Sequence, residues 1–120
     1  MDYVNYLVIA LFLLFIFKKF LPTKGVNHIT TTELKTKLTN KHIQFIDVRT
    51  PGEFKGNHIR GFHNIPLQQL AGKAEKELSK EKEVIVICQS GMRSGQASKI
   101  LKKLGFSQVT NVKGGMSTWS

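Results

Sequence analysis

The stretch EVIVICQSGMRS, residues 83–94, joins an apolar run to a turn and contains the one cysteine of the chain, Cys88. Residues 84–87 are all apolar and β-branched, which predicts a strand that is buried on both faces. Gly91 allows a tight turn after this strand, and apolar residues at helical spacing then continue until Gly105. A strand that leads directly into a helix is the repeating unit of an α/β fold.

The same alternation extends over the rest of the globular part. Residues 44–48 and 108–112 are short runs that are typical of strands. Thr30 and Glu33 have the spacing of a capping box, which predicts that a helix begins there. A further helix is predicted from its apolar positions, Leu67, Leu70, Ala71, Ala74 and Leu78. We therefore predict an α/β fold with a mostly parallel sheet that is flanked by helices.

The loop after residues 84–87 combines a thiol with groups that stabilise an anion. Cys88 follows the strand at its carboxyl end, where parallel sheets bind ligands. A thiolate is the reactive form of cysteine, and it needs hydrogen-bond donors and positive charge nearby. The turn at Gly91 would direct the backbone N–H groups of residues 89–94 into one concavity, and Arg93 adds a permanent charge. We predict an anion-binding loop with Cys88 as its nucleophile.

Composition narrows the classes of function. A chain of 120 residues has room for one domain and a short extra segment. Its single cysteine excludes an intramolecular disulfide and fits a reducing compartment. The net charge of +10 would suit nucleic acid, but the basic residues are not interleaved with aromatic ones, so we predict no nucleic-acid partner. The four histidines show no metal-ligand spacing with the cysteine, and no metal is predicted.

The amino-terminal segment differs from the rest of the chain. Residues 6–17 are uninterrupted apolar residues, and with weaker flanks the span covers residues 3–21, about 28 Å as a helix. No small-residue cleavage site follows it, so we predict an uncleaved transmembrane helix rather than a signal peptide. A buried core helix is the alternative.

Basic residues follow the apolar run of residues 6–17, at Lys18, Lys19 and Lys24. Such residues favour the cytoplasmic side of a membrane. The prediction is a single-pass membrane protein in contact with lipid, with a linker over residues 22–27. The globular domain, residues 28–120, would face the cytoplasm.

Six short motifs in the globular part have the order and spacing of a known family. They are DVR at 47–49, EF at 53–54, HIRG at 58–61, NIP at 64–66, CQSGMR at 88–93 and GGMSTW at 114–119. No single motif is highly specific, but together they resemble a single rhodanese domain. The resemblance covers essentially the whole globular part.

The resemblance implies a sulfurtransferase. In rhodanese-like enzymes the cysteine takes a sulfane sulfur from a donor such as thiosulfate and holds it as a persulfide. It then passes the sulfur to a thiophilic acceptor such as cyanide or a thiol, which a protein can supply. Cys88 is then the nucleophile and the persulfide carrier, and no metal or organic cofactor is implied.

The resemblance also implies which residues surround Cys88. The active-site loop comprises Gln89, Ser90, Gly91, Met92, Arg93 and Ser94. Its backbone N–H groups would stabilise the thiolate and the terminal sulfur, while Arg93 would steer the anionic donor. Asp47 and Arg49 are predicted to support the site, Asp47 by bracing a loop and Arg49 by helping to bind substrate.

Two other functions stay open. Cysteine phosphatases place the arginine six positions after the cysteine, whereas Arg93 is five positions after Cys88. The smaller loop favours sulfur chemistry over that of a phosphatase or an arsenate reductase. Rhodanese-like domains also serve as non-catalytic binding modules, here at the membrane, typically when the cysteine is lost. The presence of both Cys88 and Arg93 favours an enzyme, although the sequence identifies neither its physiological donor nor its acceptor.

Overall fold

The computed structural model describes residues 2–20 and 25–120. In this part of the chain the strands are β1 (Val26–Ile29), β2 (Gln44–Asp47), β3 (His63–Asn64), β4 (Val84–Ile87) and β5 (Val109–Val112). The α-helices are α1 (Tyr3–Phe20), α2 (Thr31–Lys35), α3 (Pro51–Gly56), α4 (Leu67–Glu77) and α5 (Met92–Lys103), and a 3₁₀ helix, η1 (Gly115–Thr118), follows them. Residues 22–24 of the predicted linker lie outside the described residues.

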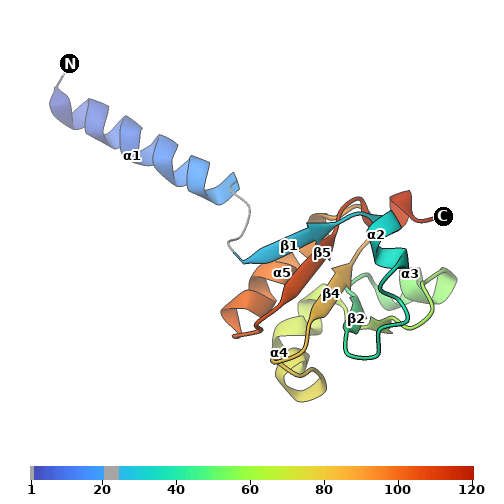
Figure 1. Ribbon diagram of the computed structural model, residues 1–120. Coiled ribbons are helices and arrows are strands. Elements are labelled where there is room, and N and C mark those ends of the chain that lie inside the picture. The colour runs from blue at the N-terminus through green and yellow to red at the C-terminus, as the bar shows by residue number, and fades with distance from the viewer. Residues whose placement is uncertain (1, 21–24) are drawn as a thin grey trace.

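The strands form one sheet in the order β1-β5-β4-β2-β3, and every neighbouring pair is parallel (Figure 1). The predicted α/β fold with a parallel sheet flanked by helices is therefore confirmed. β4 lies at the centre of the order, and all four of its residues are buried. Cys88 follows β4 directly, at the carboxyl end of the strands, where parallel sheets bind their ligands.

Helices cover both faces of the sheet. Side chains alternate between the two faces along each strand, so β4 contributes to a core on each side. Val84 and Val86 of β4 belong to a core that α4 and α5 complete. Ile85 and Ile87 face the other way and belong to a second core, to which α2 contributes Leu34. The continuous apolar run of β4 is thus explained by burial on two sides.

Most of the predicted elements are confirmed, with local differences. Thr30 caps α2, and its side chain accepts the Glu33 backbone N–H at 3.1 Å. The helix predicted from Leu67 to Leu78 is α4, in which Leu70 and Ala74 are buried and Ala71 is exposed. β1, α3 and β3 were not predicted, and each is six residues or shorter.

The predicted membrane anchor is not supported. α1 has 18 residues, and most of its apolar side chains up to residue 17 are exposed. Within residues 2–20 and 25–120, however, no helix is both long and apolar enough to cross a bilayer. The uninterrupted apolar run of residues 6–17 rises only about 18 Å as a helix, against a hydrocarbon core of about 30 Å. The prediction of a single-pass membrane protein with a cytoplasmic domain is therefore wrong. Neither the transmembrane helix over residues 3–21, whose last residue lies outside the described ones, nor contact with membrane lipid through it is supported.

Candidate active site

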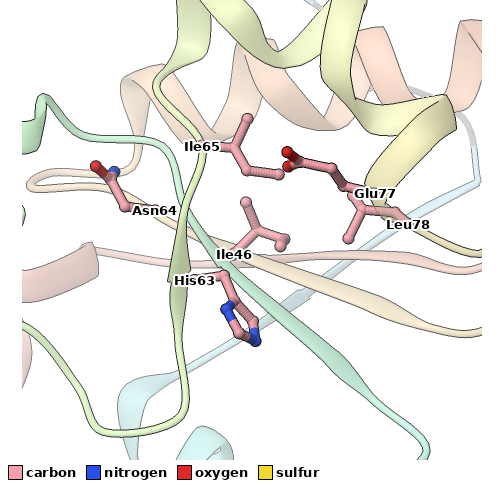
Figure 2. Close-up of a pocket in the computed structure, with 6 residues that line it drawn as sticks. All are labelled: Ile46, His63, Asn64, Ile65, Glu77 and Leu78. Carbon is pink, nitrogen blue, oxygen red and sulfur yellow. The ribbon is translucent and has the colours of Figure 1, made fainter.

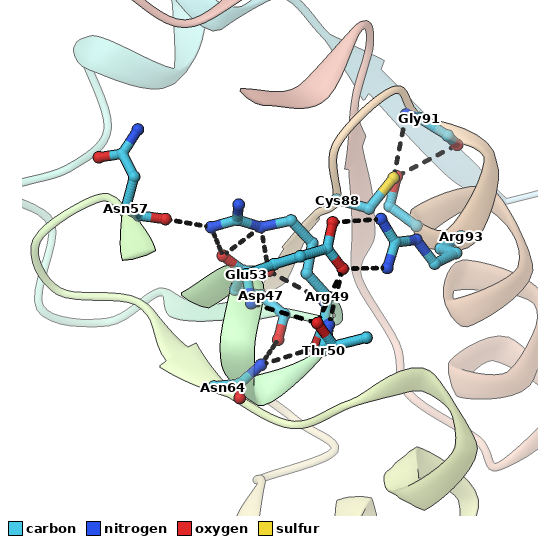
Figure 3. Close-up of polar contacts among 10 residues, drawn as sticks. Asp47, Arg49, Thr50, Glu53, Asn57, Asn64, Cys88, Gly91 and Arg93 are labelled. Carbon is cyan, nitrogen blue, oxygen red and sulfur yellow. Dashed lines mark hydrogen bonds and ion pairs between the residues drawn. The ribbon is translucent and has the colours of Figure 1, made fainter. Parts of the chain in front are cut away.

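Cys88 lies at the base of the loop that connects β4 to α5. Its side chain is a free thiol and is fully buried. The Gly91 backbone N–H donates to Sγ at 3.0 Å (Figure 3). The Ser94 Oγ lies 3.3 Å from Sγ. Gly91 has a φ of 103°, in the left-handed region that favours glycine, so the chain turns at this residue and begins α5 at Met92. The turn therefore wraps the loop around the sulfur atom.

The helix η1 holds the base of this loop from the other side. The Met116 backbone N–H donates to the Cys88 carbonyl oxygen at 2.8 Å, and the Ser117 N–H donates to the Gln89 carbonyl oxygen at 2.9 Å. The carbonyl oxygens of Cys88 and Gln89 thus accept hydrogen bonds from η1 and not from groups around the sulfur. Gly115 makes this close approach possible, because a Cβ at this position would collide with the Cys88 carbonyl group. The motif GGMSTW is therefore part of the support of the site.

Two opposing effects act on the pKa of the Cys88 thiol. Burial is the larger single effect and raises the pKa, because it disfavours the charged form. Hydrogen bonds from the Ser94 side chain, and from the backbone of Ser94, Gly91 and Ser90, favour the thiolate. Together they outweigh burial and lower the pKa below its ordinary value of 9.0. The loop therefore favours the nucleophilic form of the sulfur.

Arg93 forms an ion pair that the sequence did not predict. Its two terminal nitrogens donate to the two carboxylate oxygens of Glu53, at 2.6 and 2.9 Å (Figure 3). This pairing raises the pKa of Arg93 and keeps the guanidinium charged. Both side chains are about one-third exposed, with values of 35% and 34%. The positive charge of Arg93 is therefore held in place by Glu53 and partly balanced by its carboxylate.

The start of α3 explains how Glu53 reaches Arg93. Thr50 is the N-cap of α3, and the two residues form a capping box in which each side chain accepts the backbone N–H of the other. The hydrogen bond from Arg93, followed by that from the Thr50 backbone, lowers the pKa of Glu53 to about 2. The sequence TPGE carries the signature of a capping box, with proline at N1. This signature could have located α3, but not the ion pair across the site.

We expect the ion pair to contribute to stability in a pH-dependent way. The pKa of Glu53 is lowered from 4.5 to about 2, so the contribution is complete above pH 4.5 and is lost as the pH falls towards 2. Glu53→Gln keeps a side chain that can cap the helix but removes the charge. At neutral pH it should lower the free energy of unfolding by up to about 1 kcal/mol, the range for exposed pairs.

Urea denaturation of both proteins over a series of pH values measures this difference. It should shrink below pH 4.5 and disappear below pH 2, as Glu53 itself becomes protonated. A difference that is the same at every pH would show that the carboxylate charge does not stabilise the fold.

Asp47 and Arg49 lie at the carboxyl end of β2 and pair with each other. Both are buried, and their side chains form an ion pair at 2.8 Å (Figure 3). Arg49 also donates to the Asn57 carbonyl oxygen at 2.6 Å. The Asn64 side chain donates to the backbone carbonyls of both Asp47 and Arg49 at 2.9 Å. These contacts tie the carboxyl end of β2 to β3 and to the chain after α3.

The structure thus brings part of the predicted site together around the sulfur. Gly91 and Ser94 contact Sγ directly, and Arg93 is close enough for its pKa to respond to Cys88. The other loop side chains are exposed, namely Gln89, Ser90 and Met92. A separate hollow of about 350 Å³ is lined by Ile46, His63, Asn64, Ile65, Glu77 and Leu78 (Figure 2). No residue of the Cys88 loop lines this hollow.

Comparisons with known proteins agree with this geometry. Residues 30–120 match the rhodanese-like domain family. The chain is 42% identical over 90 residues to the uncharacterized protein YqhL of Bacillus subtilis, an alignment that covers 75% of this chain and 71% of YqhL. It is 30% identical over 96 residues to a sulfurtransferase of Allochromatium vinosum, covering 79% of this chain and 89% of that protein.

A solved structure shows the same fold. The crystal structure of a rhodanese-like domain protein from Staphylococcus aureus superimposes with a TM-score of 0.72 and 33% identity, covering 78% of this chain and 91% of that one. Residues 30–120, which match the family, include the Cys88 loop, Glu53 of α3, which pairs with Arg93 of that loop, and η1. The chain therefore belongs to the rhodanese-like domain family.

Proposed function

We propose that the protein is a sulfurtransferase that carries a sulfane sulfur as a persulfide on Cys88. The observation that carries this proposal is the loop around Sγ, in which a backbone N–H at 3.0 Å and a hydroxyl at 3.3 Å approach a sulfur with a lowered pKa. Such a loop stabilises a negative charge on the first sulfur and, after transfer, on a second one. The membership of the family and the sulfurtransferase among its relatives support the same activity.

The first half of the proposed reaction uses an anionic donor such as thiosulfate. The Cys88 thiolate attacks the outer sulfur of thiosulfate, and a new S–S bond forms. The S–S bond of the donor breaks, and its electron pair leaves with sulfite. The product is a Cys88 persulfide with its negative charge on the terminal sulfur, so the covalent carrier is the protein's own sulfur and no cofactor takes part.

In the second half, a thiophilic acceptor such as cyanide or a thiolate attacks the terminal sulfur. The S–S bond of the persulfide breaks, and its electron pair returns to Cys88 as the thiolate. In this scheme the loop N–H groups bind the anionic atoms at each stage. Arg93 attracts the donor through a charge that Glu53 partly balances, so we assign the larger share of anion binding to the N–H groups.

Thiocyanate formation from thiosulfate and cyanide tests the proposed function. The full chain should turn over this pair of substrates, while hydrolysis of an aryl phosphate, measured alongside, should stay at the uncatalysed rate. Phosphate release without thiocyanate would overturn the proposal in favour of a cysteine phosphatase. The absence of both activities in a folded protein with a reduced thiol would overturn it in favour of a binding module.

A further inference from the structure

A chain of hydrogen bonds leads from the Cys88 sulfur to His28 on the edge strand β1. Ser94 Oγ donates to Asn111 Oδ1 at 2.5 Å. The Asn111 amide nitrogen in turn lies 3.3 Å from Nδ1 of His28. Asn111 is buried, with 7% of its surface exposed, whereas His28 is exposed on the edge strand β1. The loop sulfur is thus connected to a histidine that has no place in the proposed reaction.

The register of the sheet places these side chains together. His28 of β1 is paired with Asn111 of β5, and Asn111 is paired with Val86 of β4, two residues before Cys88. Because paired residues point to the same face and faces repeat every two residues, the side chains of His28, Asn111 and Cys88 all lie on one face. α5 covers this face and supplies Ser94 from its first turn.

The direction of this hydrogen-bond chain depends on the protonation of Cys88. In the thiol form, the S–H donates to Ser94 Oγ, whose one hydrogen donates to Asn111 Oδ1. The amide nitrogen of Asn111 then donates to His28, so Nδ1 of His28 is an acceptor and its hydrogen is on Nε2. The Gly91 carbonyl oxygen, 3.2 Å from Ser94 Oγ, is a more distant acceptor for the same hydrogen.

A thiolate cannot donate, so it requires the Ser94 hydrogen for itself. Ser94 Oγ and Asn111 Oδ1 would then be two acceptors only 2.5 Å apart. Turning the Asn111 amide by half a turn removes this conflict, because its nitrogen then donates to Ser94 and its oxygen faces His28. The amide occupies the same volume in both orientations, so the core needs no repacking. His28 must now donate through Nδ1.

We propose that Asn111 and His28 are positioning residues that couple the orientation of the Ser94 hydroxyl to the charge state of Cys88. Asn111 turns as Cys88 ionises, and His28 exchanges the tautomer with Nε2–H for the tautomer with Nδ1–H. The thiol proton goes to water, and His28 loses one proton to water at Nε2 and takes one from water at Nδ1. The charge of His28 is therefore unchanged.

The elements that pack against the strand of His28 carry basic side chains. The elements packed against β1 are β5 and α5. All charged residues from the start of α5 to the end of the β5 region are basic, namely Arg93, Lys99, Lys102, Lys103 and Lys113.

Nitrogen-15 NMR of the His28 imidazole tests the coupling directly. The coupling rests on the Cys88 thiolate of the proposed function. The measurement itself requires no sulfur transfer, so the coupling can fail while sulfur transfer holds, and the reverse is also possible. At a pH above the measured titration of Cys88, the wild type should carry the hydrogen on Nδ1. In Cys88→Ser, whose neutral hydroxyl stands for the thiol, it should be on Nε2. The same tautomer in both proteins would overturn the proposal.

A second measurement uses the pH dependence of Cys88 alkylation. His28→Leu removes the donor that the thiolate form requires, so the thiolate fraction at neutral pH should fall by about three- to tenfold, the value of one hydrogen bond. His42→Leu is the matched control, because His42 is also exposed but precedes β2, at the opposite end of the parallel strands. Equal titrations in the wild type and His28→Leu would overturn the proposal.

Discussion

Replacement of Cys88 by serine is expected to reduce thiocyanate formation to the uncatalysed rate. A serine hydroxyl is not ionised at neutral pH, and an alcohol oxygen does not hold a sulfane sulfur as a thiolate does. Serine nevertheless fits the volume of cysteine, and its hydroxyl can contact Ser94 and the Gly91 N–H, which approach Sγ at 3.3 and 3.0 Å. The loss should therefore be chemical rather than structural.

Two measurements separate these effects in Cys88→Ser. The rate of thiocyanate formation reports the chemistry, and thermal unfolding followed by circular dichroism reports the fold. The free energy of unfolding should change by no more than about 1 to 2 kcal/mol, as for other similar-sized substitutions at buried sites. If turnover survived in the serine variant, the sulfur would not be carried by Cys88.

The second large effect is expected from Gly115→Ala, which places a methyl group against the backbone of the site. Gly115 has a φ of 55°, and its Cβ would collide with the Cys88 carbonyl oxygen and lie 2.9 Å from the carbonyl carbon. The left-handed conformation and the overpacking should together lower the free energy of unfolding by about 2 to 4 kcal/mol. The shifted loop should also reduce turnover on the order of 100-fold.

Gly72→Ala is the matched control for this prediction. Gly72 lies in α4, and a Cβ there would meet no atom within 4 Å. Alanine should stabilise the helix by about 0.5 to 1 kcal/mol and leave turnover unchanged. Urea denaturation and the thiocyanate assay measure both variants. Wild-type activity in a folded Gly115→Ala protein would show that η1 does not set the position of the Cys88 loop.

The central part of the fold could be predicted because its signals are local. The run before Cys88 is apolar on both faces of β4, and the spacing of buried residues in α5 follows a helical period. β3 could not be predicted, since its two residues pair with β2 only through the tertiary arrangement. α1 misled the prediction because apolar composition indicates burial in some apolar environment, but it does not by itself give the length that a bilayer requires.

The candidate site divides in the same way. The loop from Cys88 to Arg93 is continuous in sequence, so the residues around the sulfur could be named from it. Glu53 lies 40 residues before Arg93 and was recognised only as part of a motif. Asn111 was missed entirely, because in the sequence it is one polar residue within a short strand. Only the register with β1 and β4 shows that it faces Ser94 and His28.

Intact-mass spectrometry of the full chain after incubation with thiosulfate tests the central claim most directly. The wild type should gain one sulfur atom, cyanide should remove it, and Cys88→Ser should gain none under the same conditions. A wild-type protein that is folded, carries a reduced thiol and gains no sulfur would contradict the account. An equal gain in Cys88→Ser would contradict it as well.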